Sequence, residues 1–194
     1  MNTSFSVPEP LPQLMKVAEE VKKASISLGQ ATNEERCNAL LSMAKALSDK
    51  SSEILEANLI DLERSSDEGL GKSLIARLQL NEAKLQACID GVLKVSELSD
   101  PVGKRQLHRE LDERLILERV TVPLGVLGVI FESRPDALIQ IASLAIRSGN
   151  GALLKGGSEA RITNQAIMQA LVGGLNKSSI GAGALSLLTT RQES

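Results

Sequence analysis

Apolar residues recur every three or four positions through the first hundred residues, which is the spacing of helices that bury one face. The first such stripe consists of Leu14, Val17, Ala18, Val21 and Ala24. A second helix is predicted to start at the capping-box pattern Thr32–Glu35 and to bury Cys37, Leu40, Leu41, Ala44 and Leu47. We expect a third helix over about residues 53–64. A fourth is expected from near Asn81, burying Leu85, Cys88, Ile89 and Val92. Residues 1–100 are therefore predicted to form a helical part.

The apolar spacing changes to a period of two after the Asp-Pro-Val-Gly segment at residues 100–103. Asp112, Glu113 and Arg114 are predicted to form a turn between two strands. In the second strand one face carries Leu115, Leu117, Arg119 and Thr121, and the other carries Ile116, Glu118, Val120 and Val122. Two-faced ribbons of this kind are often edge hairpins that pair with another subunit. Residues 105–122 are predicted to be an oligomerisation-type hairpin, through which a homo-oligomer could form.

The remaining part, residues 123–194, has the pattern of a strand–helix–strand–helix–strand unit. Its continuous apolar strand at residues 124–131 is typical of a parallel sheet that is covered on both faces. The later segments are a helix at residues 137–148, a strand at 152–154, a helix at 161–175 and a strand at 184–188. The predicted fold class is α/β, with N-terminal helices, a β-hairpin and a partial doubly wound parallel sheet of three strands.

Composition narrows the function classes. The 194 residues are 42% apolar and 24% charged, and the formal net charge of −2 provides no basic field for nucleic acid. There are two Phe, no Tyr and no Trp, so stacking platforms for bases are also disfavoured. No apolar run is long enough to span a membrane, and residues 1–14 have no pattern of a secretory signal. We therefore expect a cytoplasmic protein with no nucleic-acid or membrane partner.

The side chains that could carry out catalysis are few. Cys37 and Cys88 both lie on apolar helical stripes, which favours a structural role over that of a catalytic thiolate. His108 is the single histidine, so neither a nucleophile–histidine pair nor a metal cluster is predicted. The Gly71-Lys72-Ser73 segment lacks the earlier glycine and the strand of a phosphate loop, and is expected to be a loop or a helix start.

The strongest local motif is the Lys155-Gly156-Gly157-Ser158-Glu159 segment, which follows a predicted parallel strand and precedes a helix. Ligands of α/β sheets bind at such positions, and helix N-termini favour anions. Lysine can bind a phosphate, and glutamate can accept hydrogen bonds from ribose hydroxyls. These residues by themselves fit a nucleotide site or an ordinary strand–helix turn with a solvated lysine.

Three segments carry a resemblance to a known family. They are Val122–Pro135, which includes Glu-Ser-Arg-Pro, Ala145–Asn150, and Lys155–Ala160. Together they resemble the gamma-glutamyl phosphate reductase (glutamate-5-semialdehyde dehydrogenase) family of the aldehyde dehydrogenase superfamily. The hairpin and the helical third are similar to that family as well. The resemblance covers essentially the whole chain and implies an incomplete aldehyde-dehydrogenase-like cofactor domain.

The resemblance also implies a reaction. Members of the family use NADPH to reduce the small-molecule substrate L-glutamyl 5-phosphate to glutamate 5-semialdehyde in proline biosynthesis. A cysteine thiolate of the enzyme first displaces the phosphate, and hydride then reduces the resulting thioester. Neither cysteine of this chain matches the family's catalytic motif. We therefore expect the thiol-bearing domain to be absent and the chain to be inactive by itself. The alternative is a truncated, non-catalytic fragment that binds nucleotide or pairs with a subunit.

The resemblance assigns roles to individual residues. Lys155 matches the superfamily lysine that contacts the adenosine ribose or its 2′-phosphate, and Ser158 is expected to contact that phosphate. Glu159 resembles the glutamate that binds the ribose hydroxyls, although its gap from Lys155 is one residue longer than in many members. Gly156 and Gly157 complete the expected cofactor loop. Ser133 and Arg134 are expected at the substrate, with a salt bridge from Arg134 to Glu132 or Asp136 as the structural alternative.

Overall fold

The computed structural model describes residues 12–188, so the ends of the predicted helical part and of the strand–helix unit lie outside the described residues. Within that range five helices precede a hairpin and an α/β unit. The first helices are α1 (Pro12–Gln30), α2 (Asn33–Asp49), α3 (Ser51–Asp67), α4 (Lys72–Leu78) and α5 (Glu82–Glu97). The hairpin consists of β1 (Arg105–Asp112) and β2 (Leu115–Val120). The α/β unit consists of β3 (Val126–Ile130), α6 (Pro135–Arg147), β4 (Gly151–Lys155), the short 3₁₀ turn η1 (Ser158–Ala160), α7 (Arg161–Leu175), a second such turn η2 (Ala182–Ala184) and β5 (Leu185–Leu187).

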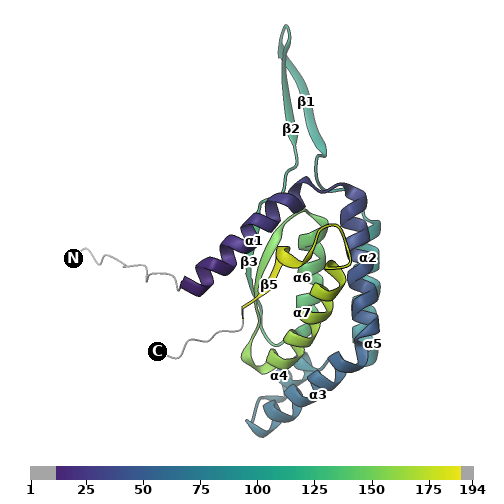
Figure 1. Ribbon diagram of the computed structural model, residues 1–194, viewed down its shortest axis with the longest axis vertical. Coiled ribbons are helices and arrows are strands. Elements are labelled where there is room, and N and C mark those ends of the chain that lie inside the picture. Colours follow the sequence, from purple (N-terminus) through teal and green to yellow (C-terminus); the bar gives the residue numbers. More distant parts are fainter. Residues whose placement is uncertain (1–11, 189–194) are drawn as a thin grey trace, which may run out of the picture.

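The predicted parallel sheet is confirmed. Its strands lie in the order β3-β4-β5, and both pairs are parallel. Helix α1 packs on one face of the sheet, while α6 and α7 pack on the other, with α2 and α5 outside them (Figure 1). Helices on both faces of a parallel sheet define the doubly wound α/β arrangement. The predicted fold class is therefore confirmed for the part of the chain that is described.

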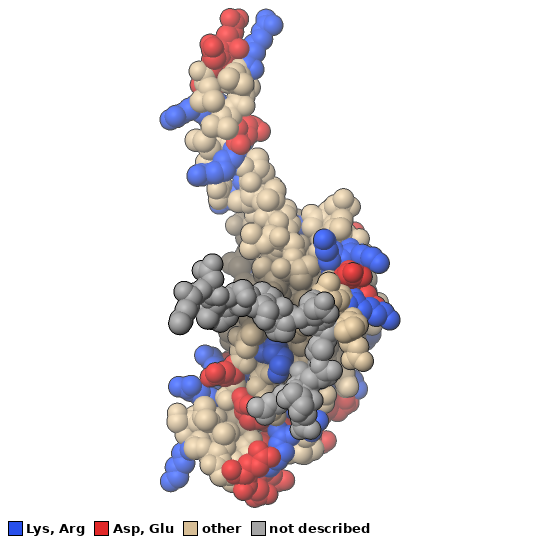
Figure 2. Space-filling model, turned by 90° about the vertical axis from the view of Figure 1, so that its left-hand side faces the viewer, with Lys and Arg blue, Asp and Glu red and all other residues tan. Residues whose placement is uncertain are grey.

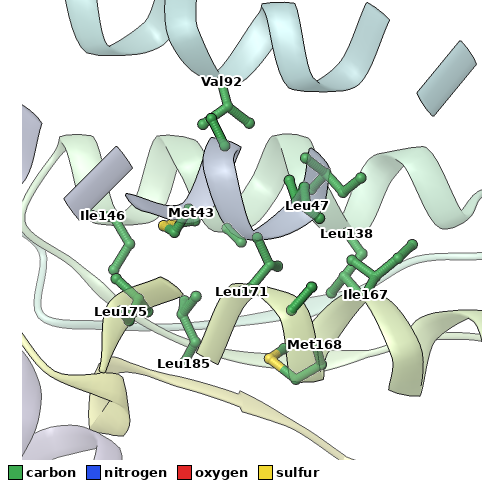
Figure 3. Packing of buried hydrophobic residues seen from close by; sticks show 14 of the residues in the cluster. Met43, Leu47, Val92, Leu138, Ile146, Ile167, Met168, Leu171, Leu175 and Leu185 are labelled. Atoms are coloured by element: carbon green, nitrogen blue, oxygen red, sulfur yellow. The ribbon is translucent and has the colours of Figure 1, made fainter. Parts of the chain in front are cut away.

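The hydrophobic core lies where α2 and α7 meet, between the sheet and α5. Side chains from α2, α5, α6, α7 and β5 interdigitate there (Figure 3), among them Met43, Leu47, Val92, Ile146, Leu171 and Leu185. The capping box is present as predicted, because Thr32 Oγ1 accepts from Glu35 N–H and the Glu35 carboxylate accepts from Thr32 N–H. The predicted α5 stripe, Leu85, Cys88, Ile89 and Val92, is buried.

Three of the five residues predicted for the α2 stripe, Leu40, Ala44 and Leu47, are buried, and the prediction is wrong at Leu41. Leu41 is 47% exposed and Cys37 is only partly buried, whereas Ala39 and Met43 are fully enclosed. Helix α2 is contacted on two sides, by α5 and by α7. The buried face therefore extends to Ala39 and Met43, and an apolar stripe read for one covered side does not predict the second.

Strand β3 departs from the expected coverage of both faces. Leu124 and Ile130 are each 83% exposed, although both belong to the apolar run that predicted a buried strand. β3 lies at an edge of the described sheet and pairs with β4 on one side only. Val126, Leu127 and Val129 of β3 are half-buried, and Val129 packs against the core, so it is Ile130 at the end of the strand and Leu124 before it that face outward.

The hairpin projects away from the body (Figure 1). Its strands are antiparallel, Arg109 lies opposite Leu117, and the predicted turn at residues 112–114 is present, with Arg114 in the left-handed region at φ 64°. Almost every hairpin residue is exposed, including the apolar side chains of Leu111, Leu115, Ile116, Leu117 and Val120. Charged side chains gather toward the tip in the view of Figure 2.

Buried arginines hold the segment that leads into the hairpin. Arg36, which is 1% exposed, pairs with Asp100 at 2.6 Å, and Arg147 donates to the carbonyl of Leu98. The base of the hairpin is thus fixed by α2 and α6. No other described residue covers the two strands beyond that base.

Among the described helices, none combines the length and the apolar character needed to cross a lipid bilayer.

Candidate functional site

A groove of about 520 Å³ lies where β4 and β5 end and α7 begins. It is lined by Lys155, Gly156, Gly157, Ser158, Arg161 and Asn164, together with Leu187 and Leu188. The carboxyl ends of parallel strands are the usual ligand-binding edge of an α/β sheet. Four of the five residues of the predicted cofactor loop therefore line one concave surface, and the fifth, Glu159, does not.

The two cations of the groove belong to Lys155 and Arg161. The Lys155 ammonium donates to the carbonyl oxygen of Gly156 at 3.1 Å. Arg161 is exposed at the first position of α7. Neither side chain forms an ion pair with a residue in the range 12–188 under a 4 Å limit, and no carboxylate lines the groove. The groove therefore favours an anionic group, as expected of a helix N-terminus with two cations beside it.

Polar side chains occupy the space beside the two glycines. A Cβ at Gly156 would clash with the carboxamide of Asn164, and one at Gly157 would clash with the carboxylate of Glu159. Neither glycine has a positive φ. The sequence motif therefore specifies room for two polar side chains that lie against the loop, rather than an unusual backbone conformation.

The Glu159 carboxylate faces Ser133. One oxygen, Oε1, accepts from the backbone N–H of Ser133 at 2.7 Å and from its hydroxyl at 2.6 Å. Burial opposes ionisation of Glu159, but the hydrogen bonds from Ser133 and the charge of Lys155 outweigh it and lower the pKa of this carboxyl. The structure brings Ser133 and Glu159 together, which the sequence placed in two separate candidate sites.

Ser133 occupies the elbow between β3 and α6 in a strained conformation. Its φ is 30°, a region that non-glycine residues rarely adopt, and it is 5% exposed. The two hydrogen bonds to Glu159 hold it there. Its neighbour Arg134 is exposed and pairs with Asp136 at 2.9 Å, so the salt bridge considered as the structural alternative is present.

A buried polar network from α3 supports the same loop, and no sequence motif indicated it. The Arg64 guanidinium donates to the carbonyl oxygens of Ser158 and Glu159 at 2.9 and 3.0 Å and to Asp61 at 2.8 Å. The other Asp61 oxygen accepts from the N–H and the hydroxyl of Thr163 at 2.7 and 2.8 Å. The loop and the first turn of α7 are thereby fixed to α3, about a hundred residues earlier in the chain.

Neither cysteine lies at this groove. Cys88 is buried and lines a separate apolar cavity of about 440 Å³ between α5 and α6, and burial raises the pKa of its thiol to about 11. Cys37 is partly buried; its Sγ donates to the carbonyl of Ser96 at 3.2 Å and lies 3.4 Å from the Arg147 guanidinium. Among residues 12–188 no cluster of three potential metal ligands is formed.

The chain aligns over its full length with proteins of one kind. It is 76% identical over 194 residues to the gamma-glutamyl phosphate reductase of Prochlorococcus marinus strain NATL1A, and 62% identical over 188 residues to that of Synechococcus sp. strain WH7803. It covers 44% and 43% of these two proteins, respectively. The chain is related along its whole length to the gamma-glutamyl phosphate reductases. It spans less than half the length of the curated relatives it matches. No protein-family model matches it.

Solved structures agree with this relationship. The gamma-glutamyl phosphate reductase of Thermotoga maritima has a TM-score of 0.87 at 36% identity, covering 90% of this chain and 42% of the other. That of Saccharomyces cerevisiae has a TM-score of 0.89 at 37% identity, covering 94% of this chain and 47% of the other. A salicylaldehyde dehydrogenase from Pseudomonas putida G7 has a TM-score of 0.71 at 15% identity, and the match covers 93% of this chain and 34% of the dehydrogenase. This last likeness shows the fold alone, that of the aldehyde dehydrogenases.

Proposed function

We propose that the chain is the cofactor-binding part of a gamma-glutamyl phosphate reductase, which reduces L-glutamyl 5-phosphate to glutamate 5-semialdehyde in the cytoplasm as a step of proline biosynthesis. The observation that carries this proposal is the 76% identity over all 194 residues to a relative of that name. The fold supports it, because the groove lies at the strand ends where α/β domains bind nucleotides.

The proposed cofactor is NADPH, with its adenosine end in the groove. The 2′-phosphate of NADPH carries the charge that Lys155 and Arg161 can neutralise, and the hydroxyl of Ser158 is a further donor beside them. The absence of a carboxylate from the lining favours this assignment, since a carboxylate there would repel the phosphate. When bound, the cofactor supplies hydride, and the role of these residues is to hold and orient it.

The elbow at residues 132–135 is proposed to contact the substrate. Ser133 and Arg134 lie between β3 and α6, next to the cofactor loop through the Ser133–Glu159 hydrogen bonds. The Arg134 side chain is 57% exposed and its partner Asp136 is close to it along the chain. An anionic substrate group can therefore compete with Asp136 for the Arg134 guanidinium, because an ion pair with a largely exposed member contributes little to stability.

The hairpin is proposed to pair with a second copy of the chain. Its exposed apolar side chains on both faces support this, because such a surface on a monomeric protein is rarely left uncovered. Together with the unpaired edges of β1 and β2, these side chains provide both backbone and side-chain contacts for a partner ribbon.

The cofactor proposal is tested by Lys155→Ala. A charge-assisted contact contributes roughly 1.5–3 kcal/mol, so NADPH binding by the variant should weaken about ten- to a hundredfold. NADH, which has no 2′-phosphate, should lose less affinity. Calorimetric titration of the 194-residue chain with both cofactors measures the two dissociation constants.

Lys177→Ala is the matched control, because Lys177 is an exposed lysine just beyond the C-terminal end of α7, whereas the groove lies at the N-terminal end of that helix. It should bind both cofactors as the unmodified chain does. Equal affinities of the Lys155→Ala variant and the unmodified chain for NADPH would contradict the assignment of the groove to the cofactor.

A further inference from the structure

Asn164 is the one buried asparagine of the groove, and its side-chain oxygen is unsatisfied within the described residues. The residue is 2% exposed, and Oδ1 has no hydrogen-bond partner among residues 12–188. Buried polar atoms are nearly always paired, and an unpaired one is unfavourable. An apolar residue of similar size would fit this position with no such penalty. The asparagine therefore requires an explanation beyond packing.

Asn58 shows what a structural asparagine looks like in the same protein. It is 1% exposed, and its Nδ2 donates to the carbonyl of Leu78 at 3.0 Å and to Thr163 Oγ1 at 3.3 Å. Its Oδ1 accepts from the backbone N–H of Leu80 at 2.8 Å. Both ends of its carboxamide are used within the fold. Asn164 lies one residue after Thr163, in the first turn of α7, and lacks these partners.

The side chain of Asn164 lies against the loop at residues 155–159. Its Nδ2 lies 2.3 Å from the position that a Cβ of residue 156 would take, and the residue lines the same groove as Lys155, Ser158 and Arg161. A carboxamide can turn end over end about its terminal torsion at low energy. Either its oxygen or its nitrogen can therefore be directed to a group that enters the groove beside Gly156.

We propose that Asn164 binds a ribose hydroxyl of the nucleotide, a deduction that rests on the proposed function of the groove. A hydroxyl is both donor and acceptor, so it can satisfy either end of the carboxamide. Glu159, the residue expected for this contact, does not line the groove, and its Oε1 accepts two hydrogen bonds from Ser133. Asn164 is the buried polar side chain that remains in the groove lining.

A carboxamide at the ribose is compatible with a 2′-phosphate beside it. A carboxylate next to the ribose would attract hydroxyls but repel a 2′-phosphate, whereas a neutral carboxamide accepts a hydroxyl bond and tolerates a neighbouring phosphate. Asn164 thus provides ribose recognition in a groove whose cations, Lys155 and Arg161, serve the phosphate. The contact is made to a group that NADPH and NADH share.

The test compares Asn164→Leu with Asn58→Leu in the 194-residue chain, using NADPH and NADH as probes. Asn164→Leu removes an unpaired polar atom, so the melting temperature should be unchanged or higher. Its dissociation constants for both cofactors should rise about three- to tenfold, the loss of one neutral hydrogen bond. Asn58→Leu leaves the N–H of Leu80 without its acceptor and should lower the melting temperature.

Lys155→Ala separates the failure of this deduction from that of the cofactor proposal. If Lys155→Ala weakens NADPH binding but Asn164→Leu changes neither dissociation constant, Asn164 is not a ligand contact and the inference is overturned. If neither variant changes binding, the groove is not the nucleotide site, and both proposals are overturned. Asn164→Ala is the second variant, because it cannot overfill the site; unchanged affinities in a folded Asn164→Ala protein also overturn the inference.

Discussion

At the scale of single residues, the motif at residues 155–159 predicted which side chains gather but not where each one points. Lys155, Gly156, Gly157 and Ser158 line the groove, whereas the Glu159 carboxylate is turned to Ser133. The spacing of the motif is compatible with a Glu159 side chain in the groove and with one turned toward Ser133. What decides between them is Ser133, whose strained backbone presents its N–H and hydroxyl together. That conformation depends on how β3 enters α6, which residue identities in the loop do not encode.

The Ser133–Glu159 pair predicts a pH dependence. The pKa of Glu159 is lowered from an ordinary value of 4.5, so its ionised form stabilises the folded chain above that value. This contribution is lost as the pH falls through 4.5 and below. Glu159→Gln has no group to titrate. The melting temperature of the unmodified chain should exceed that of the variant by a constant amount between pH 6 and 8, and the difference should shrink below pH 4.5.

Other carboxylates with lowered pKa values, such as Glu35 and Glu118, titrate in both proteins and cancel in the difference. A difference in melting temperature that stays constant down to pH 3 would show that the Glu159 charge does not strengthen its hydrogen bonds with Ser133.

At the scale of elements, the buried Asp61 joins α3 to α7 and the groove. It is fully buried and accepts from Arg64 and from both donors of Thr163. The apolar spacing predicts α3 and α7 separately, with the boundaries of α7 that the structure has. The bond between them could not be predicted, because an aspartate within a helix is usually solvated and nothing local marks its distant partner.

Asp61→Asn should therefore destabilise strongly. The substitution removes the charge that Arg64 and Thr163 share, and breaking a buried charged network costs about 3 kcal/mol. Because the loop carbonyls lose the support of Arg64, NADPH binding should weaken as well. Urea denaturation followed by circular dichroism measures the free energy of unfolding. Asp67→Asn, an exposed site on the same helix, should change it by less than about 0.5 kcal/mol; equal losses for the two variants would contradict a special role for Asp61.

The hairpin is the second element with a testable role. If it pairs with another copy, a charge in its apolar face should prevent pairing without affecting the fold, because Leu117 is 44% exposed. Leu117→Glu should shift the chain toward a monomer at the same melting temperature. Sedimentation equilibrium measures the mass. Leu59→Glu, at a 59% exposed leucine on α3, is the control and should leave the mass unchanged. An unmodified chain that is monomeric at micromolar concentration would contradict the pairing.

At the scale of the whole molecule, the alternation of helical and extended patterns was enough for the fold class, the order of the elements and the parallel sheet. For the short helix α4 the sequence predicts only a loop or a helix start near Gly71. The apolar run at residues 124–131 predicts a strand covered on both faces, whereas Ile130 is exposed on an edge strand of the described sheet. Local periodicity indicates that a segment is apolar, but which neighbours cover it depends on the arrangement of the other elements.

The network around Asp61 also bears on how the chain reaches its fold. The bonds from Asp61 to Thr163 link residues 102 positions apart, and the bond from Asn58 to Thr163 links residues 105 apart. At a synthesis rate of about 5–20 residues per second, Asp61 leaves the ribosome roughly 5–20 s before its partner does. During that interval α3 can form as a helix but cannot complete its packing. The Asp61 carboxylate has to remain hydrated until Thr163 of α7 can donate to it. The groove is consequently assembled in the last stage of folding, when the two ends of this long loop close.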